Sequence, residues 1–233
     1  MVKRSIFIVI EGTDGSGKTV QFKRLLKRIK RQGFKCKVLD FPQYGRPSAY
    51  FIENYLKGKY GQWQQVNPYQ ASLFYALDRF EISSQIKKWL AQGKIVLSNR
   101  YVASNLGHQG AKIKNKKNRK NFFFWINNLE YKILQIPKPD LNIFLHLPAA
   151  IAYELIKKRE KGGIKKRDIH ENLDHLIKAE KTYLEIVKLF SKDFITIECS
   201  QKKKIISREE IEEKIWEVVN KKIYDNKKRF FKN

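Results

Sequence analysis

The sequence predicts an α/β fold in which a doubly wound, parallel five-stranded sheet carries helices on both faces. Five short apolar segments alternate with longer segments of helical periodicity, and a glycine-rich turn follows the first of them. That first segment, residues 5–10 (SIFIVI), is nearly continuously apolar and rich in β-branched residues, which is typical of a strand buried on both faces. Because parallel neighbours require a crossover connection, strands that alternate with helices favour a parallel sheet. The length of 233 residues suits one domain over residues 1–233.

Four further apolar segments resemble the first strand in length and composition. They cover residues 35–40, 94–98, 141–147 and 194–199. In sheets of this kind, ligands bind at the carboxyl ends of the strands. The positions that directly follow each strand are therefore the candidate functional positions.

The segments between the strands have helical spacing and recognisable helix ends. The helix after the glycine-rich turn ends near Gly33, and Ser48 is a suitable N-cap for the next one. Asn67 and Pro68 are typical of the N-cap and first turn of a third helix, which Gly93 ends. The expected helices cover residues 18–32, 48–56, 68–92, 121–135, 149–159, 168–190 and 208–222.

The chain is strongly basic. It has 49 Lys and Arg residues against 23 Asp and Glu residues, so its formal net charge is +26. Such a charge attracts anions such as nucleotides, nucleic acids or acidic membranes. The lysines are spread over the whole chain and no recognised nucleic-acid-binding motif is present. We therefore expect solvated lysine side chains and no nucleic-acid partner.

The cysteines and the apolar segments indicate the compartment. Cys36 and Cys199 lie far apart and lack metal-ligand spacing, so we expect buried free thiols in a reducing environment. The first apolar run is too short for a signal peptide. No stretch approaches the roughly twenty apolar residues that a spanning helix needs. We expect a cytoplasmic protein without membrane contact.

The turn after the first strand has the pattern G-x-x-x-x-G-K-T, between a strand and a helix. Glycines let backbone N–H groups converge on an anion, and the helix that follows adds its positive N-terminal end. We expect Lys18 to contact the β- and γ-phosphates of a nucleoside triphosphate, and the Thr19 hydroxyl to bind Mg²⁺. This pattern predicts a P-loop NTPase-type fold. The expected nucleotide-binding residues are Gly12, Thr13, Asp14, Gly15, Ser16, Gly17, Lys18 and Thr19.

Motifs that follow the other strands are specific as a set. They are FPQYG at residues 41–45, LFYALDR at 73–79, NRY at 99–101 and VASNLGHQG at 102–110. In this order, and over residues 6–190, the chain resembles the thymidylate kinases, which transfer the γ-phosphoryl group of ATP to dTMP for dTTP synthesis. The resemblance implies ATP and dTMP as ligands, Mg²⁺ as a cofactor with ATP, and a homodimer packed through helices.

The resemblance also assigns roles in the acceptor site. Tyr75 would stack on thymine and Arg79 would hydrogen-bond the base, while Arg100 would bind the acceptor phosphate. Asn105 and Gln109 would face the polar edge of the thymine. Aromatic rings and amide groups suit a flat base, and a guanidinium suits a phosphate. The implied substrate-binding residues are Phe41, Tyr44, Phe74, Tyr75, Arg79, Arg100, Ser104, Asn105, His108 and Gln109.

Several positions of the expected site differ from the usual family pattern. Asn99 stands where the family has an aspartate, so we expect Mg²⁺ to depend on other groups, with Thr19 and Asp14 as candidates. His108 replaces a tyrosine near the place of a ribose 2′-hydroxyl, which loosens the expected sugar discrimination. Tyr44 occupies a position where some relatives have an arginine.

A basic segment at about residues 157–167 is the expected lid. Phosphoryl transfer builds charge on shared oxygens, so catalysis consists mostly of positioning and neutralisation. Gly15 follows Asp14 where some thymidylate kinases carry an arginine, and the resemblance implies that the lid supplies that charge instead. Arg159 and Arg167 flank Gly162-Gly163 in this segment. The expected catalytic residues are Lys18, Asp14, Arg100, Arg159 and Arg167.

Two alternatives stay open on the sequence alone. Asn99 and His108 also fit a related kinase with a different or broader acceptor, such as another pyrimidine monophosphate or a deoxynucleoside. The charge of +26 also fits a nucleic-acid-binding P-loop ATPase, against which the acceptor-site motifs argue.

Overall fold

Five parallel strands form the central sheet, as the sequence predicts, and the structure places them in the order β2-β3-β1-β4-β5. The computed structural model describes residues 5–161 and 172–229, with side chains for residues 5–159 and 172–224. The strands are β1 (Ile6–Glu11), β2 (Cys36–Asp40), β3 (Ile95–Asn99), β4 (Leu141–His146) and β5 (Phe194–Glu198). A short hairpin, β6 (Ser200–Gln201) and β7 (Lys204–Ile205), follows the last strand.

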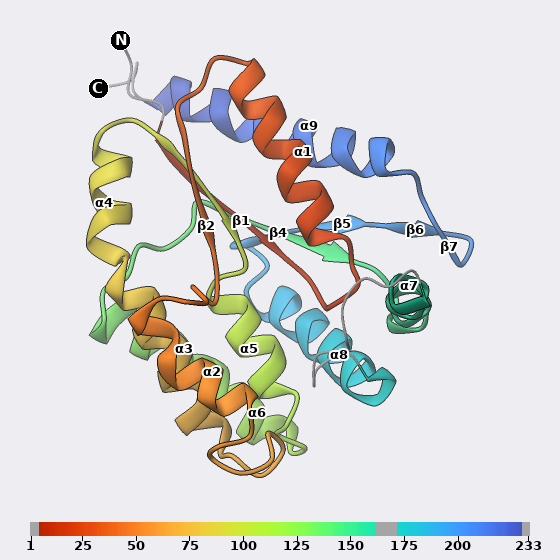
Figure 1. The fold of residues 1–233 in the computed structure, drawn as a ribbon. Helices are drawn as coiled ribbons and strands as arrows, with labels where there is room; N and C mark the ends of the chain where they lie inside the picture. Colours follow the sequence, from red (N-terminus) through yellow and green to blue (C-terminus); the bar gives the residue numbers. More distant parts are fainter. Residues whose placement is uncertain (1–4, 162–171, 230–233) are drawn as a thin grey trace.

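Helices cover both faces of this sheet (Figure 1). They are α1 (Lys18–Arg31), α2 (Tyr50–Leu56), α3 (Pro68–Glu81), α4 (Ser83–Ala91), α5 (Val102–Gly110), α6 (Lys116–Asn127), α7 (Ala149–Lys161), α8 (Leu173–Leu189) and α9 (Arg208–Arg229), with a 3-10 turn η1 (Pro47–Ala49) and a π-helical segment η2 (Asn128–Ile133). Helices α1 and α9 pack on one face, and α4, α5, α6 and α8 on the other. The predicted doubly wound fold is confirmed.

The alternation of side chains along β1 explains the two cores. Ile6, Ile8 and Ile10 are buried against α1 and α9, whereas Phe7 and Val9 are buried on the opposite face. Successive side chains of a strand point to opposite faces, so a continuously apolar segment is what a two-sided sheet requires. This central strand holds its carboxyl end, where the site is built, in a rigid position.

The predicted helix over residues 68–92 is wrong in one respect, because the chain turns at Ile82 and forms two helices. Helix α3 packs on α5 beyond the carboxyl edge of the sheet, whereas α4 packs back onto β3. Neither glycine nor proline marks the break. Tertiary packing therefore sets the direction of each half, and the helical periodicity of the sequence does not reveal it.

Residues 101–111, which lie outside the helices expected from the sequence, contain helix α5. Two glycines weaken the helical signal there, but both permit close packing. A Cβ on Gly107 would lie 2.4 Å from the ring of Tyr183, and one on Gly110 would lie 2.7 Å from the ring of Phe123. The glycines therefore let α5 lie directly against its neighbours, which fixes the side chains it carries into the site.

The two cysteines are free thiols, as predicted. Cys199 is buried and Cys36 is only partly so. Burial raises the pKa of each thiol to about 12, so both are unreactive at neutral pH. In the part of the chain that the structure describes, no helix combines the length and apolarity needed to cross a membrane.

Candidate active site

The phosphate loop (residues 12–19) joins β1 to the first turn of α1 at the carboxyl edge of the sheet. Gly12 and Gly15 have positive φ angles of 152° and 80°. A Cβ on Gly12 would lie 2.6 Å from Ser16 Oγ, and a Cβ on Gly15 would lie 2.7 Å from the carbonyl oxygen of Ala152. The loop therefore requires glycine at both positions. Such a loop at a helix N-terminus is typical of phosphate binding.

Lys18 is buried inside this loop. Its Nζ donates to the carbonyl oxygen of Thr13 at 2.7 Å and lies 3.9 Å from Oδ1 of Asp14. Burial, together with the charge of Arg100, lowers the pKa of Lys18 to about 7. An anion that enters the loop would favour the ammonium form again, so the site is electrostatically suited to a phosphate.

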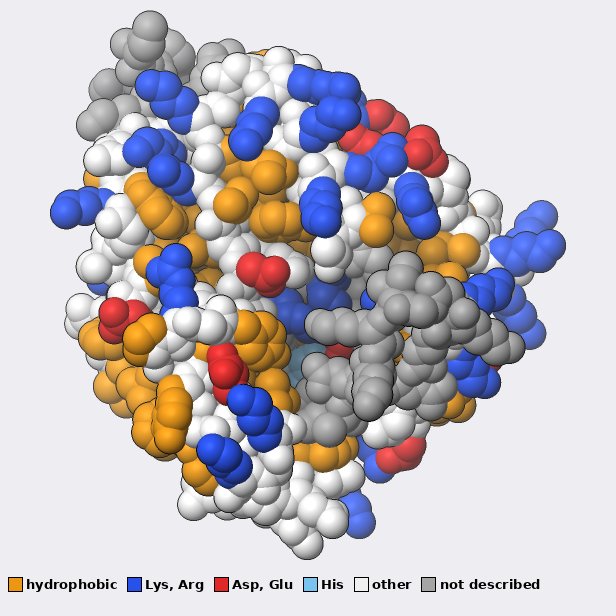
Figure 2. Space-filling view, in the orientation of Figure 1, with side chains coloured by type: hydrophobic (Ala, Val, Ile, Leu, Met, Phe, Trp, Pro, Cys, Tyr) orange, Lys and Arg blue, Asp and Glu red, His pale blue; other side chains and the backbone are white. Residues whose placement is uncertain are grey.

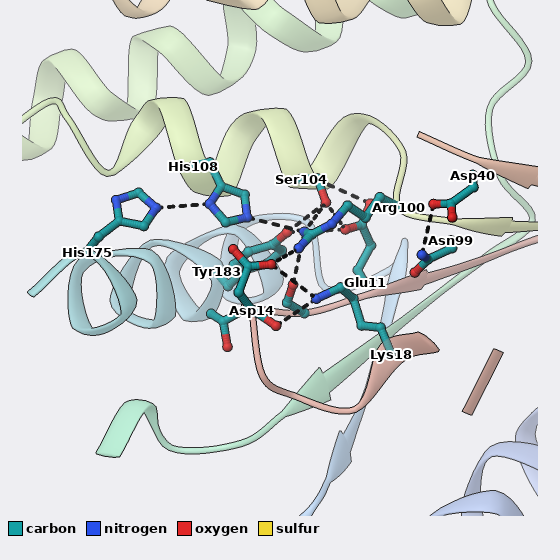
Figure 3. Close-up of polar contacts among 12 residues, drawn as sticks. Glu11, Asp14, Lys18, Asp40, Asn99, Arg100, Ser104, His108, His175 and Tyr183 are labelled. Carbon is teal, nitrogen blue, oxygen red and sulfur yellow. Dashed lines mark hydrogen bonds and ion pairs between the residues drawn. The ribbon is translucent and has the colours of Figure 1, made fainter. Parts of the chain in front are cut away.

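Arg100 lies directly above the phosphate loop (Figure 3). Its φ angle of 66° is rare for a residue other than glycine and is typical of functional positions. Nη2 forms an ion pair with Asp14, while Nη1 donates to Ser104 Oγ at 2.9 Å and to the carbonyl oxygen of Gly12 at 3.3 Å. The structure thus brings four of the predicted residues together.

Glu11 and Tyr183 support this cluster, and sequence reasoning assigned neither a role. The buried Glu11 carboxylate accepts hydrogen bonds from the Tyr101 amide at 2.7 Å, from Ser104 Oγ at 2.7 Å and from the Tyr183 hydroxyl at 3.2 Å. Burial and the Glu11 charge raise the pKa of Tyr183 well above its ordinary value. The hydroxyl therefore stays protonated and donates. Glu11 ties the end of β1 to the first turn of α5 and so positions Arg100.

His108 extends the polar chain away from Arg100. Its Nε2 lies 3.2 Å from Arg100 Nη1, and its Nδ1 lies 3.1 Å from Nε2 of His175. Because a guanidinium only donates, His108 Nε2 accepts and Nδ1 carries the proton. The two imidazole rings stack with centroids 5.4 Å apart. His108 is thus held between Arg100 and α8 (Figure 3).

The loop after β2 places its two predicted site residues in different environments. Phe41 is buried in the core, with its ring 5.5 Å from that of Tyr101. Tyr44 is 57% exposed. The Asp78 carboxylate of α3 accepts a hydrogen bond from the Gln43 amide at 2.9 Å and fixes the loop. Phe41 therefore acts as structural support, and Tyr44 is the residue of this pair that lies at the surface.

The two predicted aromatic residues of α3 both contact Tyr55 of α2, in different geometries. Phe74 stacks on Phe51, with centroids 5.6 Å apart and an interplanar angle of 19°. Tyr75 is half-buried and meets Tyr55 edge to face at 6.3 Å. Both rings thus belong to one cluster with α2. Phe74 has its ring stacked on Phe51, whereas Tyr75 meets this cluster edge to face and is the candidate platform for a base.

Arg79 is held by a partner that the sequence does not reveal. Arg79 is 2% exposed and Glu130, in η2, is 0% exposed. Arg79 Nε donates to Glu130 Oε2 at 2.8 Å, and Nη2 donates to Oε1 of the same carboxylate. One edge of the guanidinium is therefore taken by a buried bidentate ion pair, and only the opposite edge remains for a ligand.

Asn105 and Gln109 lie one turn apart on α5, and both present buried acceptors. Asn105 Nδ2 donates to the carbonyl oxygen of Ser72 at 3.2 Å. Among the described residues, Asn105 Oδ1 and Gln109 Oε1 are buried with no hydrogen-bond partner. Buried polar atoms are rarely left unpaired without a functional reason. The arrangement suits a ligand that carries hydrogen-bond donors.

Asn99 lies at the end of β3 beside Asp40, its register partner at the end of β2. Asn99 Nδ2 donates to Asp40 Oδ1 at 2.9 Å (Figure 3), while Asn99 Oδ1 is buried without a partner among the described residues. Burial raises the pKa of Asp40, against the opposing effect of this hydrogen bond. Sequence reasoning missed Asp40, although its position at the carboxyl end of a strand was a usable signal.

Of the predicted lid, only its first part can be placed. The charge of Arg159 contributes to the lowered pKa of Lys18, so Arg159 in α7 lies within electrostatic reach of the phosphate loop. Gly162, Gly163 and Arg167 lie outside the described residues. Figure 2 shows Lys, Arg and His side chains gathered in a hollow on the face viewed there.

Comparisons with known proteins agree with this geometry. The family model described as "Thymidylate kinase" matches residues 10–211. The probable thymidylate kinase of Pyrobaculum aerophilum is 34% identical over 76% of this chain and 81% of that protein. The thymidylate kinase of Mycobacterium tuberculosis is 30% identical over 67% of this chain and 71% of that protein.

A solved structure supports the fold independently. The thymidylate kinase of Candida albicans superposes with a TM-score of 0.70 at 24% sequence identity, over 94% of each chain. Its sheet and helices therefore share the arrangement of Figure 1. With the family model matching most of its length and the glycine loop and arginine cluster at the carboxyl edge of the sheet, the chain belongs to the thymidylate kinase family of phosphotransferases.

Proposed function

We propose that this chain transfers the γ-phosphoryl group of ATP to dTMP, the reaction of its family, at the carboxyl edge of β1 and β3. The phosphate loop and Lys18 bind the phosphates of ATP. Arg100 binds the phosphate of dTMP by exchanging part of its contact with Asp14 for phosphate oxygens. The observation that carries this division is that two cations share one carboxylate: Asp14 pairs with Arg100 and lies 3.9 Å from Lys18.

In this arrangement, an acceptor oxygen attacks the γ-phosphorus as the bond to the β-phosphate oxygen breaks, giving ADP and dTDP. Lys18 and Arg100 neutralise the charge shared between donor and acceptor. Arg159 and Arg167, at about residues 157–167, add positive charge from the lid. Such neutralisation is effective because the groups are held in place before the reaction.

The base of dTMP is proposed to lie between α3 and α5. Tyr75 provides a stacking surface, and the free edge of Arg79 faces the base. The carbonyl oxygens of Asn105 and Gln109, which have no hydrogen-bond partner within residues 5–159 and 172–224, accept hydrogen bonds from it. His108 takes the place near the sugar.

Mg²⁺ is proposed as the cofactor that accompanies ATP. The available donors fit this metal: Thr19 is exposed at the start of α1, Asp14 is a carboxylate of the same loop, and Asn99 Oδ1 is buried without a hydrogen-bond partner among the described residues. When bound, the ion would neutralise phosphate charge and orient the phosphates.

A homodimer packed through helices is proposed as the working assembly. Leu73, Leu77 and Phe80 are exposed along one side of α3, at spacings that place them on a common helix face. Tyr50 and Phe51 of α2 are also exposed. An apolar surface of this kind is typical of a protein interface.

We further propose that residues 1–233 form one kinase domain and that the protein is cytoplasmic, in keeping with its two free thiols. The charge of +26 would serve to attract ATP and dTMP, which are anions, rather than nucleic acid.

The test is ADP release measured with dTMP, dUMP, UMP, CMP, AMP and thymidine offered separately. We expect the highest kcat/KM with dTMP. The variant Lys18→Met, which removes the buried ammonium, should bind dTMP and keep its Tm but release no ADP. Absence of ADP release with dTMP would contradict the proposal, and a clear preference for another acceptor would favour the alternative of a kinase with different specificity.

A further inference from the structure

His175, in the first turn of α8, is a buried imidazole to which the reaction proposed above gives no role. The residue is 2% exposed. Its backbone N–H donates to the side-chain oxygen of Asn172, the N-cap of α8, at 2.8 Å, and its ring meets that of Trp63 edge to face at 4.8 Å. Its Nε2 lies 3.1 Å from Nδ1 of His108. Helix α8 thus holds a polar side chain against a residue of the site.

The chemistry of Arg100 determines where the protons of this chain lie. A guanidinium only donates, so His108 Nε2, 3.2 Å from Arg100 Nη1, is an acceptor. A neutral imidazole has one N–H group, which His108 therefore carries on Nδ1 and donates to His175 Nε2. All hydrogen bonds then run in one direction, from Arg100 through His108 to His175 (Figure 3).

The two terminal nitrogens of Arg100 have different kinds of partner. Nη2 pairs with the Asp14 carboxylate. Nη1 faces neutral acceptors, which are Ser104 Oγ at 2.9 Å, His108 Nε2 at 3.2 Å and the carbonyl oxygen of Gly12 at 3.3 Å. A phosphate that replaces Asp14 takes the Nη2 side of the guanidinium. The neutral acceptors therefore keep Arg100 oriented while its charged partner is exchanged.

Among these neutral acceptors, His108 is the one that needs a partner to remain an acceptor. The Gly12 oxygen belongs to the backbone, and the Ser104 hydroxyl donates to the Glu11 carboxylate at 2.7 Å. An imidazole can carry its proton on either nitrogen, and the hydrogen bond made by one nitrogen sets the state of the other. With the proton on Nε2, His108 would turn an N–H toward the guanidinium. Because His175 Nε2 accepts from Nδ1, it keeps Nε2 free of the proton.

We propose that His175 is a positioning residue, which keeps His108 Nε2 an acceptor for Arg100 and so holds Arg100 in the orientation that binds the acceptor phosphate. The inference rests on the proposed function, in which Arg100 binds the phosphate of dTMP. His175 itself contacts no substrate in this scheme. The affinity for the phosphate group therefore depends on His175, whereas the affinity for the nucleoside part does not.

The experiment separates these two affinities by calorimetric measurement of Kd for dTMP and for thymidine, which lacks the phosphate, with the full-length protein. The ratio of the thymidine Kd to the dTMP Kd reports the contribution of the phosphate, because effects on the base and sugar cancel in it. His175→Phe keeps an aromatic ring but removes the acceptor. A hydrogen bond to a charged group contributes about tenfold or more to a binding constant. We expect the ratio to fall by about tenfold, with little change in the thymidine Kd and in the KM for ATP.

Three further variants distinguish positioning from packing. His175→Gln offers an amide oxygen to the His108 N–H and should keep most of the ratio. Lys181→Met removes an exposed lysine elsewhere on α8 and should match the wild-type protein. In an Arg100→Ala background, His175→Phe should cause no further fall of the ratio, because its effect passes through that arginine. Tm values for all variants report whether the fold is intact.

The possible outcomes are distinct. An unchanged ratio in His175→Phe with Tm retained would overturn the inference, as would an equal weakening of thymidine and dTMP binding or an equal loss in His175→Gln. A further fall in the Arg100→Ala background would also overturn it. If His175→Phe does not fold, His175→Leu, which also lacks the acceptor, decides by the same ratio. Failure of the wild-type protein to release ADP with dTMP would instead overturn the proposed function.

Discussion

Replacement of Glu130 by glutamine tests the claim that a buried counter-ion holds Arg79 in place. Glu130 is 0% exposed and Arg79 is 2% exposed, so the change leaves a buried guanidinium without its compensating charge while preserving side-chain volume. Breaking a buried ion pair on one side costs about 3–5 kcal/mol. For a domain of this size, 1 kcal/mol corresponds to roughly 2–4 °C in Tm. We therefore expect the Tm of Glu130→Gln to fall by about 6–20 °C.

The assay is thermal unfolding followed by circular dichroism, with an exposed ion pair as the matched control. Asp174→Asn removes a carboxylate that contacts Lys178 at 2.5 Å on the surface of α8, and such pairs contribute about 0–1 kcal/mol. The double variant Arg79→Met/Glu130→Met, which buries no charge, should be more stable than Glu130→Gln. A Tm for Glu130→Gln within the range of the Asp174→Asn control would refute the reasoning.

Three further expectations concern the phosphate-facing groups. Because the pKa of Lys18 is lowered to about 7 in the free protein, Lys18 is mostly neutral at pH 8, and bound phosphates favour its ammonium form. The protein should therefore take up close to one proton when it binds ATP at pH 8, and little when it binds ATP at pH 6. Titration calorimetry in buffers of different ionisation enthalpy measures this proton uptake. Equal uptake at both pH values would contradict the expectation. Arg100→Ala should raise the KM for dTMP at least tenfold more than the KM for ATP, since a charge-assisted contact contributes about 1.5–3 kcal/mol, and steady-state kinetics with equal effects on both would exclude the acceptor role. Asn99→Asp adds a carboxylate next to Asp40, so the Mg²⁺ concentration for half-maximal rate should fall; an unchanged Mg²⁺ titration would remove position 99 from the metal site.

The parts of the fold that the sequence predicts well depend on local signals. The strand over residues 6–10 is apolar at every position because both of its faces are buried. The phosphate loop has glycine where its backbone leaves no space for a Cβ atom, as at Gly12 and Gly15. Neither signal depends on distant residues. The fold class follows from these repeated local patterns, whereas the order of the strands comes from the structure.

The errors arise where distant packing decides. The break at Ile82 separates helix α3, which packs on α5, from helix α4, which packs on β3. No glycine or proline at the break indicates in the sequence that the helix ends there. Helix α5 contains Gly107 because Tyr183, 76 positions later in the sequence (183 − 107 = 76), lies where a Cβ would be. Glu130 was missed for the same reason, since it lies 51 positions from Arg79. Motifs identify the residues of a site, whereas the groups that hold those residues in place come from elsewhere in the chain.

Burial explains why two arginines of the same site can have different tasks. The Arg100–Asp14 pair is 16% and 20% exposed, so its charges remain partly solvated, and Arg100 can exchange Asp14 for a phosphate oxygen at modest cost. The Arg79–Glu130 pair is nearly inaccessible, and separating it would leave two buried charges unpaired. Arg79 is therefore suited to present one fixed edge to a neutral base, which requires constant geometry. Arg100 is suited to a charged phosphate that is gained and lost in every turnover, which requires an exchangeable partner. We therefore propose that Arg79 serves recognition and Arg100 serves chemistry, according to how deeply the carboxylate partner of each is buried.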